Sequence, residues 1–152
     1  MKCCPKCRTK QLAQAKTKKY GVALDFCPAC KGIWFDRGEL EILLNTPSEA
    51  LQMPPRTERS SLICPLCREP MRSFFFPRTL VSVEMCPACN GLWLEHGEFK
   101  EIGTVTRHLR RSGVVPDKAA VSSEAPESPL PTGLKGALIE FINDTISSLS
   151  GW

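Results

Sequence analysis

The spacing of the cysteines constrains the fold of this chain more than any other feature. Eight of its nine cysteines form four C-P-x-C units, which are Cys4–Cys7, Cys27–Cys30, Cys64–Cys67 and Cys86–Cys89. The stretch CPACKGIWFDRGEL, which begins at Cys27, returns as CPACNGLWLEHGEF from Cys86. A motif that recurs within one chain indicates a structural unit that is used more than once. The chain therefore contains two copies of one module of roughly 40 to 50 residues.

Two cysteines separated by two residues can bind one metal ion together, because the tight turn between them also directs backbone N–H groups at the sulfurs. A second pair about 15 to 20 residues away completes a tetrahedral site, and this spacing is typical of zinc. We therefore predict two Zn²⁺ ions, one per module. The predicted ligands are Cys4, Cys7, Cys27 and Cys30 in the first module, and Cys64, Cys67, Cys86 and Cys89 in the second. Iron in a rubredoxin-like site would use the same ligands, so the spacing does not choose between the metals.

The size of the module supports a metal-stabilised fold. A unit this small rarely buries enough apolar surface to be stable by itself. A structural Zn²⁺ contributes on the order of 10–16 kcal/mol of coupled binding and folding free energy. We therefore expect each metal ion to take the place of an apolar core. Cys3 lies outside the C-P-x-C units and is interpreted as a spare thiol.

Disulfides are the competing explanation for so many cysteines, and they require an oxidising compartment. The N-terminus MKCCPKCRTK has no apolar stretch that could act as a secretion signal. The chain also lacks an apolar run of about 18 residues that could span a membrane. We therefore expect a cytoplasmic protein with reduced cysteines and no transmembrane segment.

The composition between the motifs predicts five regions. These are a first zinc ribbon at 1–46, a polar and Pro-rich linker at 47–61, a second ribbon with a longer C-terminal helix at 62–112, a disordered linker at 113–133, and an amphipathic helix at 134–152. The last segment repeats apolar residues at helical spacing, namely Leu134, Leu138, Phe141, Ile142, Leu149 and Trp152. The predicted fold class is a small metal-stabilised α+β protein with two tandem ribbons, each a β-hairpin plus a short helix, and a separate C-terminal helix.

Within each module, alternating apolar residues in YGVALDFC and LVSVEMC predict a strand that runs into the second cysteine pair, as the return arm of a hairpin. After that pair, Asp36 and Glu39 have the spacing of a capping box, which predicts a helix start. Gly32 and Gly91 follow the second pair and are expected to provide a positive φ or a close approach.

The residues of the first half, CPKCRTKQL and YGVALDFCPACKGIWFDRGELEILL, resemble the zinc ribbon of the transcription-factor-IIB-type zinc-finger family. The family pattern is C-P-x-C followed by C-P-x-C-x-G-x-W-[LF]-[DE]-x-G-E-[LF], and Cys64 to Phe99 is similar throughout. The chain departs from the pattern at Glu95-His96, where Glu replaces the commoner Asp. The resemblance implies a zinc-ribbon fold and an association with transcription-type modules, but it implies no activity.

Other residues of the repeated phrase have structural interpretations beside functional ones. Trp34 and Trp93 could stack on a base or a peptide, although covering the metal site is the simpler role. Glu39 and Glu98 could act as acids or bases, but helix capping explains them. His96 replaces Arg37 of the first copy, so we expect a solvated side chain there and no catalyst.

The first 24 residues are basic and contain no acidic residue. Their formal charge of +7 comes from Lys2, Lys6, Arg8, Lys10, Lys16, Lys18 and Lys19. Six of them, Lys6, Arg8, Lys10, Lys16, Lys18 and Lys19, are predicted to contact nucleic-acid phosphates. The total formal charge of +4 does not identify a partner, because two Zn(Cys)₄ sites would lower it to about zero.

These patterns predict a zinc-binding protein without enzymatic activity, since a Cys₄ site leaves no metal position open for a substrate. The first hypothesis is binding to nucleic acid or to the transcription machinery through the basic first ribbon. The alternative is a protein-interaction adaptor in which the ribbons and residues 134–152 bind a protein or a second copy. A thiol or zinc redox sensor that uses Cys3 is a third hypothesis. The sequence indicates no small-molecule substrate.

Overall fold

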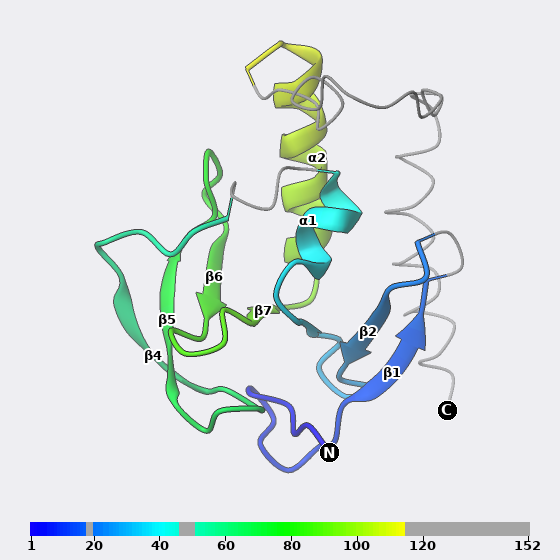
Figure 1. Ribbon diagram of the computed structural model, residues 1–152, viewed down its shortest axis with the longest axis vertical. Helices are drawn as coiled ribbons and strands as arrows, with labels where there is room; N and C mark the ends of the chain where they lie inside the picture. Colours follow the sequence, from blue (N-terminus) through cyan, green and yellow to red (C-terminus); the bar gives the residue numbers. More distant parts are fainter. Residues whose placement is uncertain (18–19, 46–50, 115–152) are drawn as a thin grey trace.

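The computed structural model describes residues 1–17, 20–45 and 51–114 (Figure 1). The helix predicted at 134–152 lies outside these residues, as does nearly all of the disordered segment predicted at 113–133. Lys18 and Lys19 also lie outside them. No helix in the described ranges is long and apolar enough to cross a membrane.

Each copy of the motif folds into three short strands and a helix. The first copy contains β1 (Ala13–Lys16), β2 (Ala23–Phe26), β3 (Ile33–Phe35) and α1 (Glu39–Leu44). The second contains β5 (Pro70–Phe75), β6 (Ser82–Met85), β7 (Leu92–Leu94) and α2 (Glu98–Arg111), preceded by β4 (Glu58–Ile63). The predicted return arms of the two hairpins are therefore β2 and β6, and the second helix is the longer one, as expected.

The two copies form one sheet. Its strand order is β1-β2-β3-β7-β6-β5-β4, and every neighbouring pair is antiparallel. The copies meet at the centre, where Trp34 of β3 lies directly opposite Trp93 of β7. The flanking pairs are Ile33 with Leu94 and Phe35 with Leu92. Equivalent strands thus pair with each other, and the ribbons are two halves of one sheet.

The apolar core is shared between the copies, which corrects the expectation that metal ions alone replace it. It is formed by 16 buried residues from both halves, including Leu24, Phe35, Val83, Leu92 and Ile102. Phe35 and Phe99 bring the halves together with ring centroids 5.5 Å apart. Figure 1 shows α1 and α2 between the two outer hairpins, and Arg110 of α2 donates hydrogen bonds to the carbonyl oxygens of Leu44 and Asn45 at 2.8 and 3.0 Å. Pooling two small apolar surfaces doubles the core that either module could build.

Only one of the two hydrogen bonds of the predicted capping box is present. The Glu39 carboxylate accepts a hydrogen bond from the Asp36 backbone N–H at 2.8 Å, and Glu98 does the same for Glu95 at 2.7 Å. The Asp36 carboxylate does not cap the helix. Gly38, with φ of 88°, precedes the first helical residue instead. A left-handed φ of this kind favours glycine, which explains the glycine of the repeated D-x-G-E and E-x-G-E stretches.

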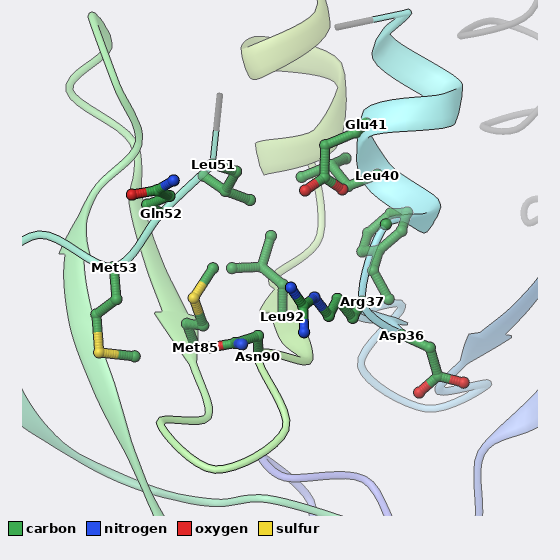
Figure 2. Close-up of a pocket in the computed structure, with 12 residues that line it drawn as sticks. Asp36, Arg37, Leu40, Glu41, Leu51, Gln52, Met53, Met85, Asn90 and Leu92 are labelled. Atoms are coloured by element: carbon green, nitrogen blue, oxygen red, sulfur yellow. The ribbon is translucent and has the colours of Figure 1, made fainter. Parts of the chain in front are cut away.

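The linker predicted at 47–61 is partly structured. Strand β4 begins at Glu58, inside that range, and forms an edge of the sheet. An edge strand with one exposed face needs few apolar residues. The polar stretch ERSS therefore contains no alternation of apolar residues from which a strand could be predicted. Figure 2 shows Leu51, Gln52 and Met53 along a cavity of about 700 Å³, across from α1. Leu51 and Met53 also pack against the shared core, so this stretch belongs to the shared body.

Candidate metal centre

Eight cysteine sulfurs gather into two groups of four, as the spacing predicts. One group is Cys4, Cys7, Cys27 and Cys30, the other is Cys64, Cys67, Cys86 and Cys89, and within each group all Sγ atoms lie within 4.8 Å of one another. Individual Sγ–Sγ distances are 3.6 Å for Cys4–Cys30, 3.9 Å for Cys7–Cys27 and 3.7 Å for Cys64–Cys89. A tetrahedron with Zn–S bonds of about 2.3 Å has edges of about 3.8 Å. The donor set and its spacing therefore fit one Zn²⁺ per group.

Each C-P-x-C turn is a zinc knuckle, and backbone N–H groups point at a sulfur in the first knuckle of each copy. The N–H of Cys7 lies 3.2 Å from Cys4 Sγ, and the N–H groups of Leu66 and Cys67 lie 3.4 and 3.3 Å from Cys64 Sγ. The chain leaves each knuckle through a left-handed residue, such as Arg8 with φ of 61°. These hydrogen bonds stabilise a thiolate, which is the form of cysteine that binds a metal cation.

The protonation of the thiols couples metal binding to pH. Burial raises the pKa of Cys30, Cys64 and Cys89 to about 11. Burial acts in the same direction on Cys27 and Cys86, but backbone hydrogen bonds and the neighbouring thiols lower the pKa of each overall. The thiols with a raised pKa thus retain their protons without a cation, and zinc binding must release those protons.

The tryptophan of each copy covers the glycine of the other. Trp34 and Trp93 are fully buried and belong to the same cluster as Cys4, Cys27, Cys64 and Cys86. A Cβ atom added at Gly32 would lie 2.6 Å from Cη2 of Trp93, and one added at Gly91 would lie 2.6 Å from Cη2 of Trp34. Of the two roles expected for these glycines, close approach is the one observed. The burial of both rings is inconsistent with a stacking platform for a base.

Lys2 forms two ion pairs with acidic residues of the first copy. Its ammonium group lies 2.6 Å from Asp25 Oδ2 and 2.8 Å from Asp36 Oδ2. Asp36 also accepts a hydrogen bond from Trp34 Nε1 at 2.8 Å. Burial raises the pKa of Asp36, but the hydrogen bonds from Lys2 and Trp34 outweigh it and hold that pKa below its usual value. In the sequence Lys2 was one of seven basic residues, and no local pattern linked it to these two carboxylates.

The second copy lacks this ammonium group. Leu62 occupies the position of Lys2, while Glu84 and Glu95 replace Asp25 and Asp36. Glu95 pairs with Lys6 of the first copy at 2.8 Å. Within the described residues, the buried atoms Glu84 Oε2 and Trp93 Nε1 have no hydrogen-bond partner. The two copies therefore share a fold but differ in the polar contacts beneath the central strands.

The basic residues predicted to bind nucleic acid divide into two groups. Lys6 pairs with Glu95, and Arg8 donates a hydrogen bond to the Ser61 carbonyl oxygen at 3.3 Å, so both join the two copies. Lys10, in the bend before β1, and Lys16, at the end of β1, are exposed. The backbones of Cys3 and Gln11 form an isolated β-bridge, and the Cys3 thiol belongs to neither sulfur group. His96 is exposed, as expected.

The sheet, the two knuckle pairs and the closed sulfur groups define a zinc-binding protein built from two tandem zinc ribbons. The family model described as "Transcription factor zinc-finger" matches residues 3–46 and 63–104, which is more than half of the chain. The chain therefore belongs to this family, in two copies, and binds two Zn²⁺ ions. No curated protein and no solved structure matches it.

Proposed function

We propose that the protein is a non-catalytic module that binds nucleic acid through Lys10, Lys16, Lys18 and Lys19 of the first ribbon. Four sulfurs around each metal leave no coordination position for a substrate, which supports a structural role for zinc. Membership of a transcription factor zinc-finger family is consistent with a partner in the transcription machinery. The observation that carries the proposal is the division of the basic residues described above.

Three cations of the first 24 residues are occupied by intramolecular contacts, namely Lys2, Lys6 and Arg8. Lys10 and Lys16 are exposed and form no ion pair with a described residue. Together with Lys18 and Lys19, which follow Lys16 closely in the sequence, they give four cations for phosphate contacts. A flexible ammonium group on an exposed hairpin can contact a phosphate without breaking any part of the fold.

The salt dependence of binding tests this number. Four phosphate contacts predict a slope of about −3.6 for log K against log salt on duplex DNA, and about −2.8 on a single strand. Participation of Lys6 and Arg8 as well would steepen the duplex slope to about −5.4. Fluorescence anisotropy with labelled DNA and RNA at several salt concentrations measures the slope. An affinity that does not change with salt contradicts the proposal.

Substitutions separate the two groups of cations. The double variant Lys10→Gln/Lys16→Gln should weaken binding and reduce the slope by about two phosphates, with both zinc ions retained. Lys100→Gln is the matched control, because Lys100 is exposed on α2, away from the first hairpin. Equal loss of affinity in the control and the double variant would show that the first hairpin is not the binding surface.

A further inference from the structure

The end of the β5–β6 hairpin exposes large apolar side chains. Leu80 is 89% exposed and Phe75 is 65% exposed, while Phe76 and Val81 between and beside them are buried in the core. Single exposed apolar residues are common, but these two end one hairpin, next to Val114, which is 50% exposed. We call Phe75, Leu80 and Val114 the hairpin patch. Such a cluster indicates a contact surface.

The chain leaves the described body at this patch. Arg78, in the turn between β5 and β6, donates a hydrogen bond from Nη1 to the Val114 carbonyl oxygen at 2.8 Å. This bond holds the end of the α2 segment against the hairpin. The last described residue, Val114, is therefore held at the turn of the hairpin that carries Leu80.

The sequence beyond Val114 is complementary to the body in charge and carries an apolar stripe. Residues 1–114 contain 18 basic and 11 acidic residues, which gives +7, or +3 once the two Zn(Cys)₄ sites are included, whereas residues 115–152 contain 2 basic and 5 acidic residues, which gives −3. The stripe consists of Leu134, Leu138, Phe141, Ile142, Leu149 and Trp152. Nineteen residues, 115–133, separate it from Val114, and a chain of that length reaches at most about 60 Å when fully extended. Covalent attachment makes docking on the same chain a unimolecular step.

We propose that residues 134–152 dock on the hairpin patch of the same chain through this apolar stripe. The occupant is the chain's own C-terminal segment because the exit point, the tether length and the opposite charge all favour it over a separate molecule. Docking would cover Leu80 and Phe75 and would bring an acidic segment close to the basic body.

Trp152 provides a direct probe in the full-length protein. Trp34 and Trp93 are fully buried, so Trp152 is the tryptophan whose emission and acrylamide quenching report its surroundings. We expect shielded, blue-shifted Trp152 emission in the zinc-loaded protein, identified by the difference from Trp152→Phe. The double variant Phe75→Ser/Leu80→Ser should abolish the shielding while zinc content stays at two per chain.

The control is Ile42→Ser, at an exposed apolar residue of α1 that is outside the hairpin patch and both zinc sites, and it should preserve the shielding. Equal quenching of Trp152 in the wild type and the double variant overturns the proposal. Shielding that disappears on dilution also overturns it, because the contact would then join two copies. Loss of shielding in the control as well would show that the contact does not depend on the hairpin patch.

Discussion

Trp93 lies against Gly32 so closely that no larger residue fits there, and Trp34 lies against Gly91 in the same way. Each ring belongs to one copy of the motif and each glycine to the other. The glycine and the tryptophan of the repeated G-x-W stretch are therefore partners across the central strands, although they are only two residues apart in each copy.

Replacing either glycine should break the central contact. Gly32→Ala and Gly91→Ala would each place a methyl group where a fully buried indole ring already lies. The ring has no space to move, so each substitution should cost about 3 kcal/mol or more of unfolding free energy. Chemical denaturation of the zinc-loaded protein measures the loss.

The matched control is Gly21→Ala, where a Cβ meets no atom within 4 Å but φ is +65°. It should cost about 1 kcal/mol through backbone strain. In a Trp93→Ala background, Gly32→Ala should add little, because the clash is gone. A cost for Gly32→Ala no larger than that of the control would contradict the interlocked packing.

The shared sheet predicts that the two zinc sites are lost together. Cys67→Ser removes one ligand from the second site, and because β7 pairs with β3, disorder there removes a neighbour from the first ribbon. We expect reduced zinc content at both sites and one transition in a chelator titration. Cys3→Ser is the control and should retain two zinc ions. Two separate transitions in the wild type would show that the ribbons are independent.

Glu84 should make stability depend on pH. Burial, aided by Glu98 and Glu95, raises the pKa of Glu84 from 4.5 to about 7. A carboxyl group with a raised pKa in the folded state favours folding below its unfolded pKa, and this contribution is lost as the pH rises through the folded pKa. The wild type should therefore lose on the order of 1 to 2 kcal/mol between about pH 5 and pH 8, after allowance for solvent screening.

Glu84→Gln should remove this part of the pH dependence and be more stable than the wild type at the alkaline end. Urea unfolding of the zinc-loaded protein across the range measures both effects. Glu101→Gln, at an exposed position in the first turn of α2, should retain the wild-type profile. An unchanged profile in Glu84→Gln would assign the pH dependence to other groups.

Leu62→Lys should give the second copy the ammonium group that Lys2 supplies in the first. Beside Glu84 and Glu95, a cation favours the ionised carboxylates, so the pKa of Glu84 should fall and the alkaline loss of stability should shrink. The same pH series measures the change. A variant that is destabilised at every pH would indicate that the second copy cannot accommodate the longer side chain.

The sequence predicted the metal centres and the local elements well, because they depend on residues close together in the chain. The spacing of the cysteine pairs determines the ligand groups, and the alternation of apolar and polar residues determines β2 and β6. The pairing of β3 with β7 was not predictable in this way, since IWF and LWL are short apolar stretches that give no information about their neighbour. Strand β4 was missed because its polar residues match its position at the edge.

The basic residues show the same difference, because their own positions were visible in the sequence and their distant acidic partners were not. Seven basic residues in one stretch suggested a single phosphate-binding surface. The acids that engage Lys2 and Lys6 lie 23 and 89 positions away, and only the fold brings them together. A charge that looks available in the sequence can thus be committed to an intramolecular contact.

The pairing of β3 with β7 has a further consequence. Ile33 and Phe35 face the counterparts of Phe35 and Ile33, with Trp34 facing its own equivalent at the midpoint, which is the arrangement of an isologous homodimer. A chain with one ribbon could build the same body from two molecules, but only above a threshold concentration. Covalent connection makes this assembly unimolecular, and it frees each half to diverge, as the replacement of Lys2 by Leu62 illustrates.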